Sequence, residues 1–116
     1  MRRLTLLALG LAAACGRPAM EAGPLHLTTS PAGSDTRLTL HADTGFRINA
    51  RLVPALELAD GTVLRFNSAE RTADSAYFTT PPTARLAGRH DQVHGTLRAS
   101  VCQADERVCR GITLSL

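Results

Sequence analysis

The chain has 116 residues, of which 13 are basic and 10 are acidic, and its formal net charge is +3. Two of the basic residues, Arg2 and Arg3, lie in the leader described next. The rest of the chain is therefore nearly neutral and lacks the basic patch that nucleic-acid binding requires. With three phenylalanines, one tyrosine and no tryptophan, it also lacks a stacking platform for carbohydrate or single-stranded nucleic acid.

The first fourteen residues have the organisation of a secretory signal peptide. Residues 1–3 carry two arginines, and residues 4–14 form an uncharged run that is shorter than the ~20 residues of a membrane-spanning helix. Three alanines then precede Cys15, which resembles the lipobox where a bacterial leader is removed and the cysteine is lipidated. We expect residues 1–14 to be removed and Cys15 to carry the lipid. Ordinary secretory cleavage after Ala14 is the alternative.

Both alternatives place the mature protein outside the cytosol. We expect it in the periplasm or the outer cell envelope, attached to a membrane through its lipid. Residues 15–24 contain two prolines and show no periodicity, so they predict the anchor and a short tether. Residues 25–116 predict the folded domain.

Apolar and polar residues alternate with a period of two along several short runs of this domain. The runs are residues 37–41, 56–58, 63–66, 93–101 and 112–116. They are separated by Gly, Pro, Asp and Asn, and no window of a dozen residues carries the apolar stripe of a helix. The sequence therefore predicts one all-β domain, an immunoglobulin-like β-sandwich with about seven strands.

Cys102 and Cys109 remain as a pair once Cys15 is assigned to the anchor. In an oxidising compartment such a pair normally forms a disulfide, and the six residues between them suit a hairpin loop. If Val101 points to the core, Cys102 points away from it, and counting back from Ile112 gives Cys109 the same orientation. We expect a surface-facing disulfide worth about 2–3 kcal/mol, which is weak for a structural crosslink.

The C-terminal hairpin, residues 95–102 through Cys109 to residues 113–116, resembles the end of the periplasmic N-terminal domain of the DsbD thiol:disulfide interchange protein. Residues 45–49, Gly-Phe-Arg-Ile-Asn, and residues 53–58 are similar to that domain's Gly-aromatic-His-Ile-Asn segment and the strand after it. The resemblance covers about residues 26–116. It departs from the family in the wider spacing of the cysteines, in Arg110-Gly111 after the second cysteine, and in Arg47 where histidine is common.

The resemblance implies a sandwich in which Cys102 and Cys109 cycle between dithiol and disulfide without a cofactor. Electrons would come from a membrane reductase and pass to periplasmic thioredoxin-like proteins. Tyr77 and Phe78 would then be candidates for an aromatic cap over the cysteines. The alternative for these two rings is packing at the edge of the core.

The histidines and the Ser, His and Asp residues of the chain do not predict a metal site or a hydrolase active site. His90 and His94 are four residues apart, about 13 Å along a strand, so one ion could not bind both. Ser, His and Asp occur without a Gly-x-Ser-x-Gly elbow to position a nucleophile. We therefore expect a membrane-tethered thiol–disulfide exchange or partner-docking module, a candidate oxidoreductase component with no metal or cofactor. The alternative is a non-catalytic envelope lipoprotein with a structural disulfide.

The lipid anchor gives a first testable prediction. Mass spectrometry of the membrane fraction should find a mature N-terminus at Cys15 with the mass of a lipid added. A Cys15→Ser variant should lose that mass and leave the membrane fraction, because the thiol is the site of attachment. A wild-type protein recovered with an unmodified N-terminus would contradict the prediction.

Overall fold

The chain folds as an all-β protein, with no helix in the described residues. The fold comes from a computed structural model that describes residues 21–105 and 108–116. The predicted signal peptide, Cys15 and most of the tether lie in residues 1–20, outside the described residues. The described part of the chain also holds no helix that is long and apolar enough to cross a membrane.

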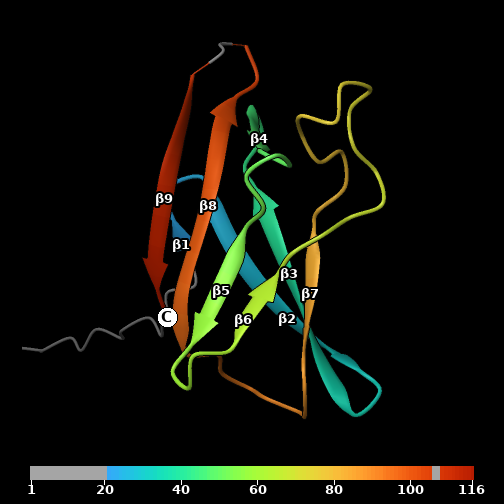
Figure 1. Ribbon diagram of the computed structural model, residues 1–116, viewed down its shortest axis with the longest axis vertical. Coiled ribbons are helices and arrows are strands. Elements are labelled where there is room, and N and C mark those ends of the chain that lie inside the picture. Colours follow the sequence, from blue (N-terminus) through green and yellow to red (C-terminus); the bar gives the residue numbers. More distant parts are fainter. Residues whose placement is uncertain (1–20, 106–107) are drawn as a thin grey trace, which may run out of the picture.

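The first sheet is antiparallel and has the strand order β1-β2-β3-β7 (Figure 1). Its strands are β1 (Glu21–Ala22), β2 (Leu25–Ala32), β3 (Asp35–Ala42) and β7 (Thr83–Leu86). Strands β2 and β3 form a hairpin closed by Gly33 and Ser34. The φ angle of Gly33 is 64°, which the first position of such a tight turn requires and which a residue with a side chain rarely adopts.

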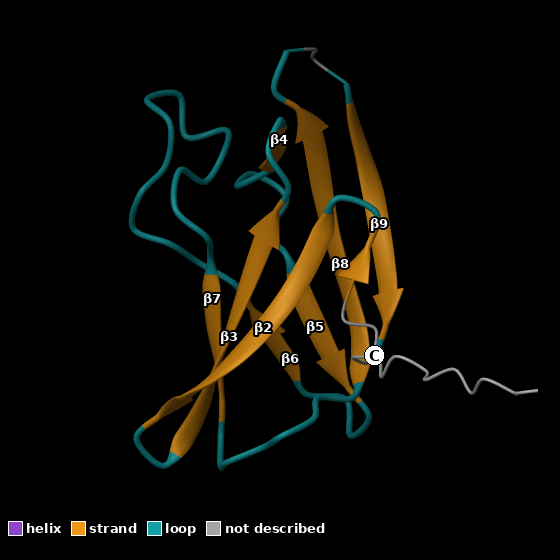
Figure 2. Cartoon of the chain, turned by 180° about the vertical axis from the view of Figure 1, so that it is seen from behind, coloured by secondary structure: helices purple, strands orange, loops and turns teal. Residues whose placement is uncertain are grey.

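The second sheet is built around its longest strand, β8 (Figure 2). Its strands are β4 (Phe46–Ile48), β5 (Ala55–Leu58), β6 (Val63–Arg65), β8 (Gly95–Gln103) and β9 (Cys109–Ser115). Along one side β8 pairs with β9 over almost its whole length. On the other side its first half pairs with β5 and its second half with β4, while β6 pairs with the free side of β5.

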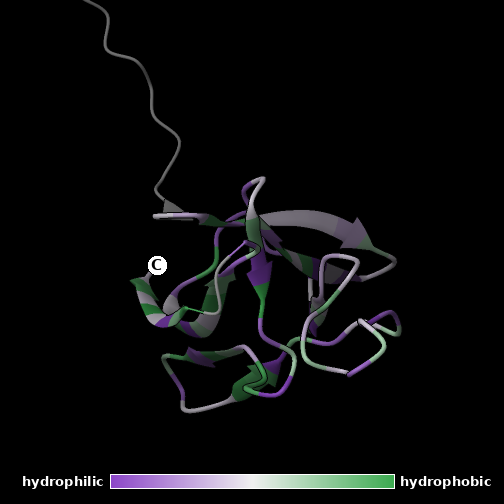
Figure 3. Cartoon of the chain, turned by 90° about the horizontal axis from the view of Figure 1, so that it is seen from above, coloured by the Kyte–Doolittle hydropathy of each residue, from purple (hydrophilic) through white to green (hydrophobic). Residues whose placement is uncertain are grey.

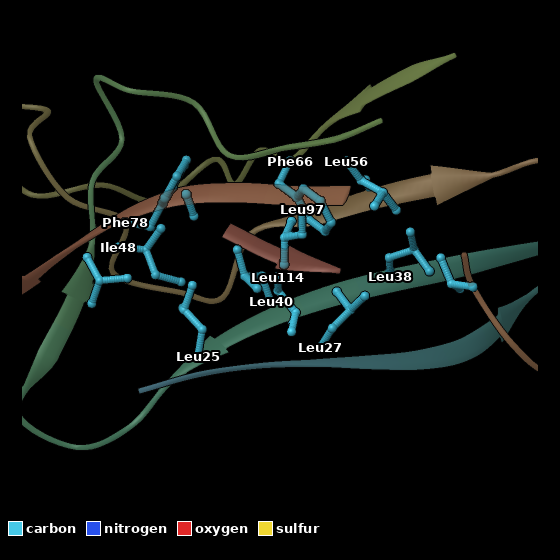
Figure 4. Packing of buried hydrophobic residues seen from close by; sticks show 14 of the residues in the cluster. Leu25, Leu27, Leu38, Leu40, Ile48, Leu56, Phe66, Phe78, Leu97 and Leu114 are labelled. Atoms are coloured by element: carbon cyan, nitrogen blue, oxygen red, sulfur yellow. The ribbon is translucent and has the colours of Figure 1, made fainter. Parts of the chain in front are cut away.

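The two sheets form separate layers when the molecule is seen from above (Figure 3), and the core fills the space between them. Figure 4 shows the leucines of β2 and β3 directed toward apolar side chains of the second sheet. The residues of this core that the close-up labels are Leu25, Leu27, Leu38, Leu40, Ile48, Leu56, Phe66, Phe78, Leu97 and Leu114. The predicted all-β sandwich is confirmed.

The period-two alternation of the sequence determines which side chains reach this core. Leu38 and Leu40 of β3 and Leu97, Ala99 and Val101 of β8 are buried in it. Strand β2 was not among the predicted runs, because polar residues and Pro31 interrupt its alternation after Leu27. On the side of β2 away from β3, β1 pairs only with the first two residues of the strand, so Pro31 lies where that edge has no neighbouring strand, and an edge tolerates proline.

Gly95 begins β8 at a position where β5 leaves no room for a side chain. A Cβ at Gly95 would collide with the main-chain carbonyl oxygen of Glu57 and crowd the Leu56 side chain.

Because the main chain cannot move aside without breaking the β5–β8 pairing, we expect Gly95→Ala to lower the free energy of unfolding by about 1–3 kcal/mol in chemical denaturation. In contrast, a Cβ at Gly111 meets nothing within 4 Å, so Gly111→Ala is the matched control and should change stability by less than about 0.5 kcal/mol. Equal effects of the two substitutions would contradict the prediction.

Candidate functional site

Cys102 and Cys109 form a disulfide at the end of the β8–β9 hairpin. The two residues are direct cross-strand partners, with their Cα atoms 3.9 Å apart. Pairing continues one position beyond the cysteines, where the Gln103 N–H donates to the Val108 carbonyl oxygen at 3.1 Å. The disulfide predicted from the sequence is confirmed.

The two sulfur-bearing residues differ in exposure, which the sequence did not predict. Cys102 is 0% exposed, whereas Cys109 is exposed. Strand parity behaves as expected, since Val101 belongs to the core cluster and Cys102 does not. The expectation of a surface-facing pair is nevertheless wrong for Cys102, whose side chain is fully buried although it points away from the core.

The neighbours of Cys102 are defined by the register of three strands. Arg47 of β4 is its partner on one side and Cys109 of β9 is its partner on the other. Side chains of directly opposed residues lie on the same face of a sheet, with Cβ atoms about 4.5–5.5 Å apart. Arg47, Cys102 and Cys109 therefore form one row across the outer face, which we call the disulfide row.

The guanidinium of Arg47 is held above this end of the sheet by two contacts. One of its N–H groups donates to the carbonyl oxygen of Ala104, just after β8, at 3.5 Å. Its central carbon lies 5.0 Å from the centroid of the Tyr77 ring, within the ~6 Å of a cation–π contact. Arg47 thus connects the disulfide row to the aromatic residue that was a candidate for a cap.

Tyr77 and Phe78 lie on opposite faces of the second sheet. Residues 76–78 run antiparallel beside residues 48–50, with Asn49 bridged to Tyr77. Alternation along this extra strand places Phe78 in the core cluster, where it is 8% exposed. Only Tyr77 lies on the face of the disulfide row, diagonal to Arg47.

The segment before Tyr77 is fixed by a turn around Asp74. The Asp74 carboxylate accepts a hydrogen bond from the Thr72 hydroxyl at 2.7 Å and another from the Ala76 N–H at 3.1 Å. The Thr72 bond, followed by the Ala76 bond, lowers the pKa of Asp74 below its ordinary value. Arg51 donates to the main-chain carbonyl of Asp74 at 2.8 Å. These bonds hold the chain that presents Tyr77 to Arg47.

A hollow of about 180 Å³ lies beside the disulfide, lined by Phe46, Val101, Gln103, Val108 and Arg110. Val101 and Arg110 are cross-strand partners one position along from the cysteines, so their side chains lie on the opposite face of the hairpin from the sulfur atoms. Val108, which also lines the hollow, is 57% exposed. The hollow therefore lies on the face of the hairpin opposite the sulfur atoms, and polar Gln103 and Arg110 line it together with apolar side chains.

The histidines weighed as metal ligands lie away from the disulfide row. The His90 N–H donates to the Thr36 hydroxyl at 2.9 Å, and a ring nitrogen of His90 is 2.8 Å from the Ala87 carbonyl oxygen. His94 is exposed just before β8. Across residues 21–105 and 108–116, no three His, Cys, Asp or Glu residues are grouped so that they could hold a metal ion.

Arg47 is the site residue whose role the sequence did not reveal. Its place in the chain differs from the histidine common in the DsbD domain, but nothing local marks it as a neighbour of a cysteine 55 positions later. That relation depends on the pairing of β4 with β8.

No known family, curated protein or solved structure matches the chain in comparisons of sequence and fold.

The unequal exposure of the two cysteines predicts unequal thiol reactivity. After reduction, a short treatment with iodoacetamide should alkylate Cys109 at least tenfold faster than Cys102, because burial shields a thiol from the reagent. Peptide mass spectrometry measures both rates. The same treatment in guanidinium chloride is the control and should make the rates similar. Equal rates in the folded protein would contradict the burial difference.

Proposed function

We propose that this domain exchanges its Cys102–Cys109 disulfide with thiols of a partner protein in the cell envelope. The observation that carries the proposal is the asymmetry of the pair, with Cys109 exposed and Cys102 fully buried. An exchange site needs one sulfur that a partner can reach and a second that stays out of reach until it is needed. The resemblance to the DsbD domain points to the same chemistry.

The geometry favours attack on Cys109. A thiolate displaces sulfur along the axis of the S–S bond, so a partner reaching Cys109 must approach from the side opposite Cys102. That side is the outer edge of β9, which is an edge strand of the second sheet (Figure 1). Attack on Cys102 would have to come from the side where β4 and Arg47 lie.

The exchange then proceeds in two balanced steps. The partner thiolate bonds to Cys109 Sγ, the S–S bond breaks, and its electron pair leaves on Cys102 Sγ as a thiolate. A second thiolate of the partner attacks the partner sulfur of this mixed disulfide and releases Cys109 as a thiolate. The partner becomes a disulfide and this domain becomes a dithiol once both thiolates take up protons. In the reverse direction Cys109 attacks and Cys102 resolves.

The fold tolerates this opening because neither cysteine belongs to the hydrophobic core cluster. Reduction removes a crosslink between residues seven apart, which is worth about 2–3 kcal/mol in the chain-entropy model. The ladder between β8 and β9 also pairs six further residue positions beyond the cysteines. The reduced domain is therefore expected to stay folded.

The partner is inferred from the resemblance. We propose a periplasmic thioredoxin-like protein on one side of the reaction and a membrane reductase on the other. A lipid on Cys15 would keep the domain at the membrane where the reductase resides.

The second candidate is a non-catalytic envelope lipoprotein in which the disulfide only closes the hairpin. The observation that favours it is the complete burial of Cys102, which is also common for structural cysteines. The two candidates differ in redox potential. Structural disulfides of secreted proteins typically lie below about −300 mV, whereas exchange sites are less negative.

Trapping of a mixed disulfide tests the proposal. In Cys102→Ser the exposed Cys109 has no resolving partner of its own. Incubation with a thioredoxin-like protein that lacks its resolving cysteine, and whose attacking cysteine is activated as a mixed disulfide with thionitrobenzoate, should therefore release thionitrobenzoate and yield a stable adduct. Cys109→Ser is the matched control, and its buried thiol should give at least tenfold less adduct on non-reducing gels and by mass spectrometry. Titration of the wild type against dithiothreitol should place its potential above about −300 mV.

Two results together would reject the exchange function. They are equal, low adduct yields from both single variants and a wild-type potential well below about −300 mV. The disulfide would then be structural, and the non-catalytic lipoprotein would be the better description.

A further inference from the structure

The disulfide row contains a cation in direct register with the buried sulfur. Arg47 and Cys102 are cross-strand partners, and both side chains lie on the outer face of the second sheet. Cys102 is 0% exposed and is flanked on its other side by Cys109. The residue that borders Cys102 on the side away from its disulfide partner is therefore an arginine.

The charge of Arg47 is balanced by no carboxylate within residues 21–105 and 108–116. The arginine ion pairs in this part of the chain join Arg85 to Asp35 and Arg98 to Glu57. The guanidinium of Arg47 instead contacts a main-chain carbonyl and the face of the Tyr77 ring, which are both neutral groups. Among the described residues, these contacts leave its positive charge without a neutralising carboxylate.

Such an anion forms when the disulfide opens. Attack on Cys109 leaves the electron pair of the broken bond on Cys102 Sγ, at a position without access to water. A buried anion is costly unless a positive charge or a hydrogen-bond donor lies close to it. We propose that Arg47 stabilises the Cys102 thiolate released during exchange, and that Tyr77 positions the guanidinium for this task. This inference rests on the exchange function proposed above.

Other charged groups near this end of the sheet are placed less favourably. Arg110 faces the opposite side of the hairpin, where it lines the hollow with Val101. Asp105 is exposed in the loop after β8 and carries the wrong sign. Arg98 lies on the outer face but four residues from Cys102, about 13 Å along the strand, and it pairs with Glu57 at 3.6 Å. Arg47 is the cation that the register brings next to Cys102.

The test titrates the Cys102 thiol directly. The chain has three cysteines, so Cys102 is the only thiol in a Cys15→Ser, Cys109→Ser background. Thiolate absorbance at 240 nm is followed against pH. Adding Arg47→Gln should move the midpoint to higher pH by about 1 unit, because an opposite charge at close range favours the anion. Arg47→Lys keeps the charge and should recover part of the shift.

Two further variants separate the role of Arg47 from net charge and from packing. Arg37→Gln removes the same charge from an exposed position on β3 of the other sheet, and it should leave the midpoint unchanged. Tyr77→Leu should raise the midpoint by less than Arg47→Gln does, since it frees the guanidinium without removing it. Tyr77→Phe retains the ring face and should match the parent.

A kinetic measurement on the intact disulfide complements the titration. Opening by dithiothreitol at fixed pH should be about threefold slower in Arg47→Gln than in wild type, because a more basic thiolate is a poorer leaving group. An unchanged midpoint in Arg47→Gln, or an equal shift in Arg37→Gln, would overturn the role of Arg47. An unchanged midpoint in Tyr77→Leu would overturn the positioning role of Tyr77. The mixed-disulfide trap decides the exchange function independently, so the two can fail separately.

Discussion

The pairing of β8 with three neighbouring strands is the constraint on which the rest of this domain depends. One face of β8 supplies core residues such as Leu97 and Val101, while the other face carries Cys102. The same pairing brings β9 to one side with Cys109 and β4 to the other with Arg47. A single strand thus carries core residues on one face and the disulfide on the other, because its side chains alternate between the two faces.

Much of this arrangement could be predicted because it depends on local alternation. The period of two predicted β3 and β8 and the inward direction of Leu38, Leu97 and Val101, and cysteine counting predicted the disulfide. Strand β2 escaped prediction, because after Leu27 it is held by its pairing with β3 and not by an apolar pattern. Alternation identifies a face but not what covers it, so the burial of Cys102 was missed.

Arg47 and Tyr77 illustrate what sequence alone could not provide. Arg47 is related to Cys102 through a register between distant strands, and Tyr77 is related to Arg47 through residues 76–78 lying beside β4. Neither relation leaves a spacing or a motif in the chain. Long-range pairing creates both relations, so only the folded structure reveals them.

The hairpin also determines what happens to the two thiols after they separate. Because the β8–β9 ladder extends well beyond the cysteines, the reduced side chains stay opposite each other at a high effective concentration. Closing a disulfide between them is then an intramolecular step. In the proposed exchange, a mixed disulfide on Cys109 would have its resolving sulfur within reach. Such an adduct would be short-lived, and release of the partner would then depend on the rigidity of the sheet and not on the affinity of the docked surfaces.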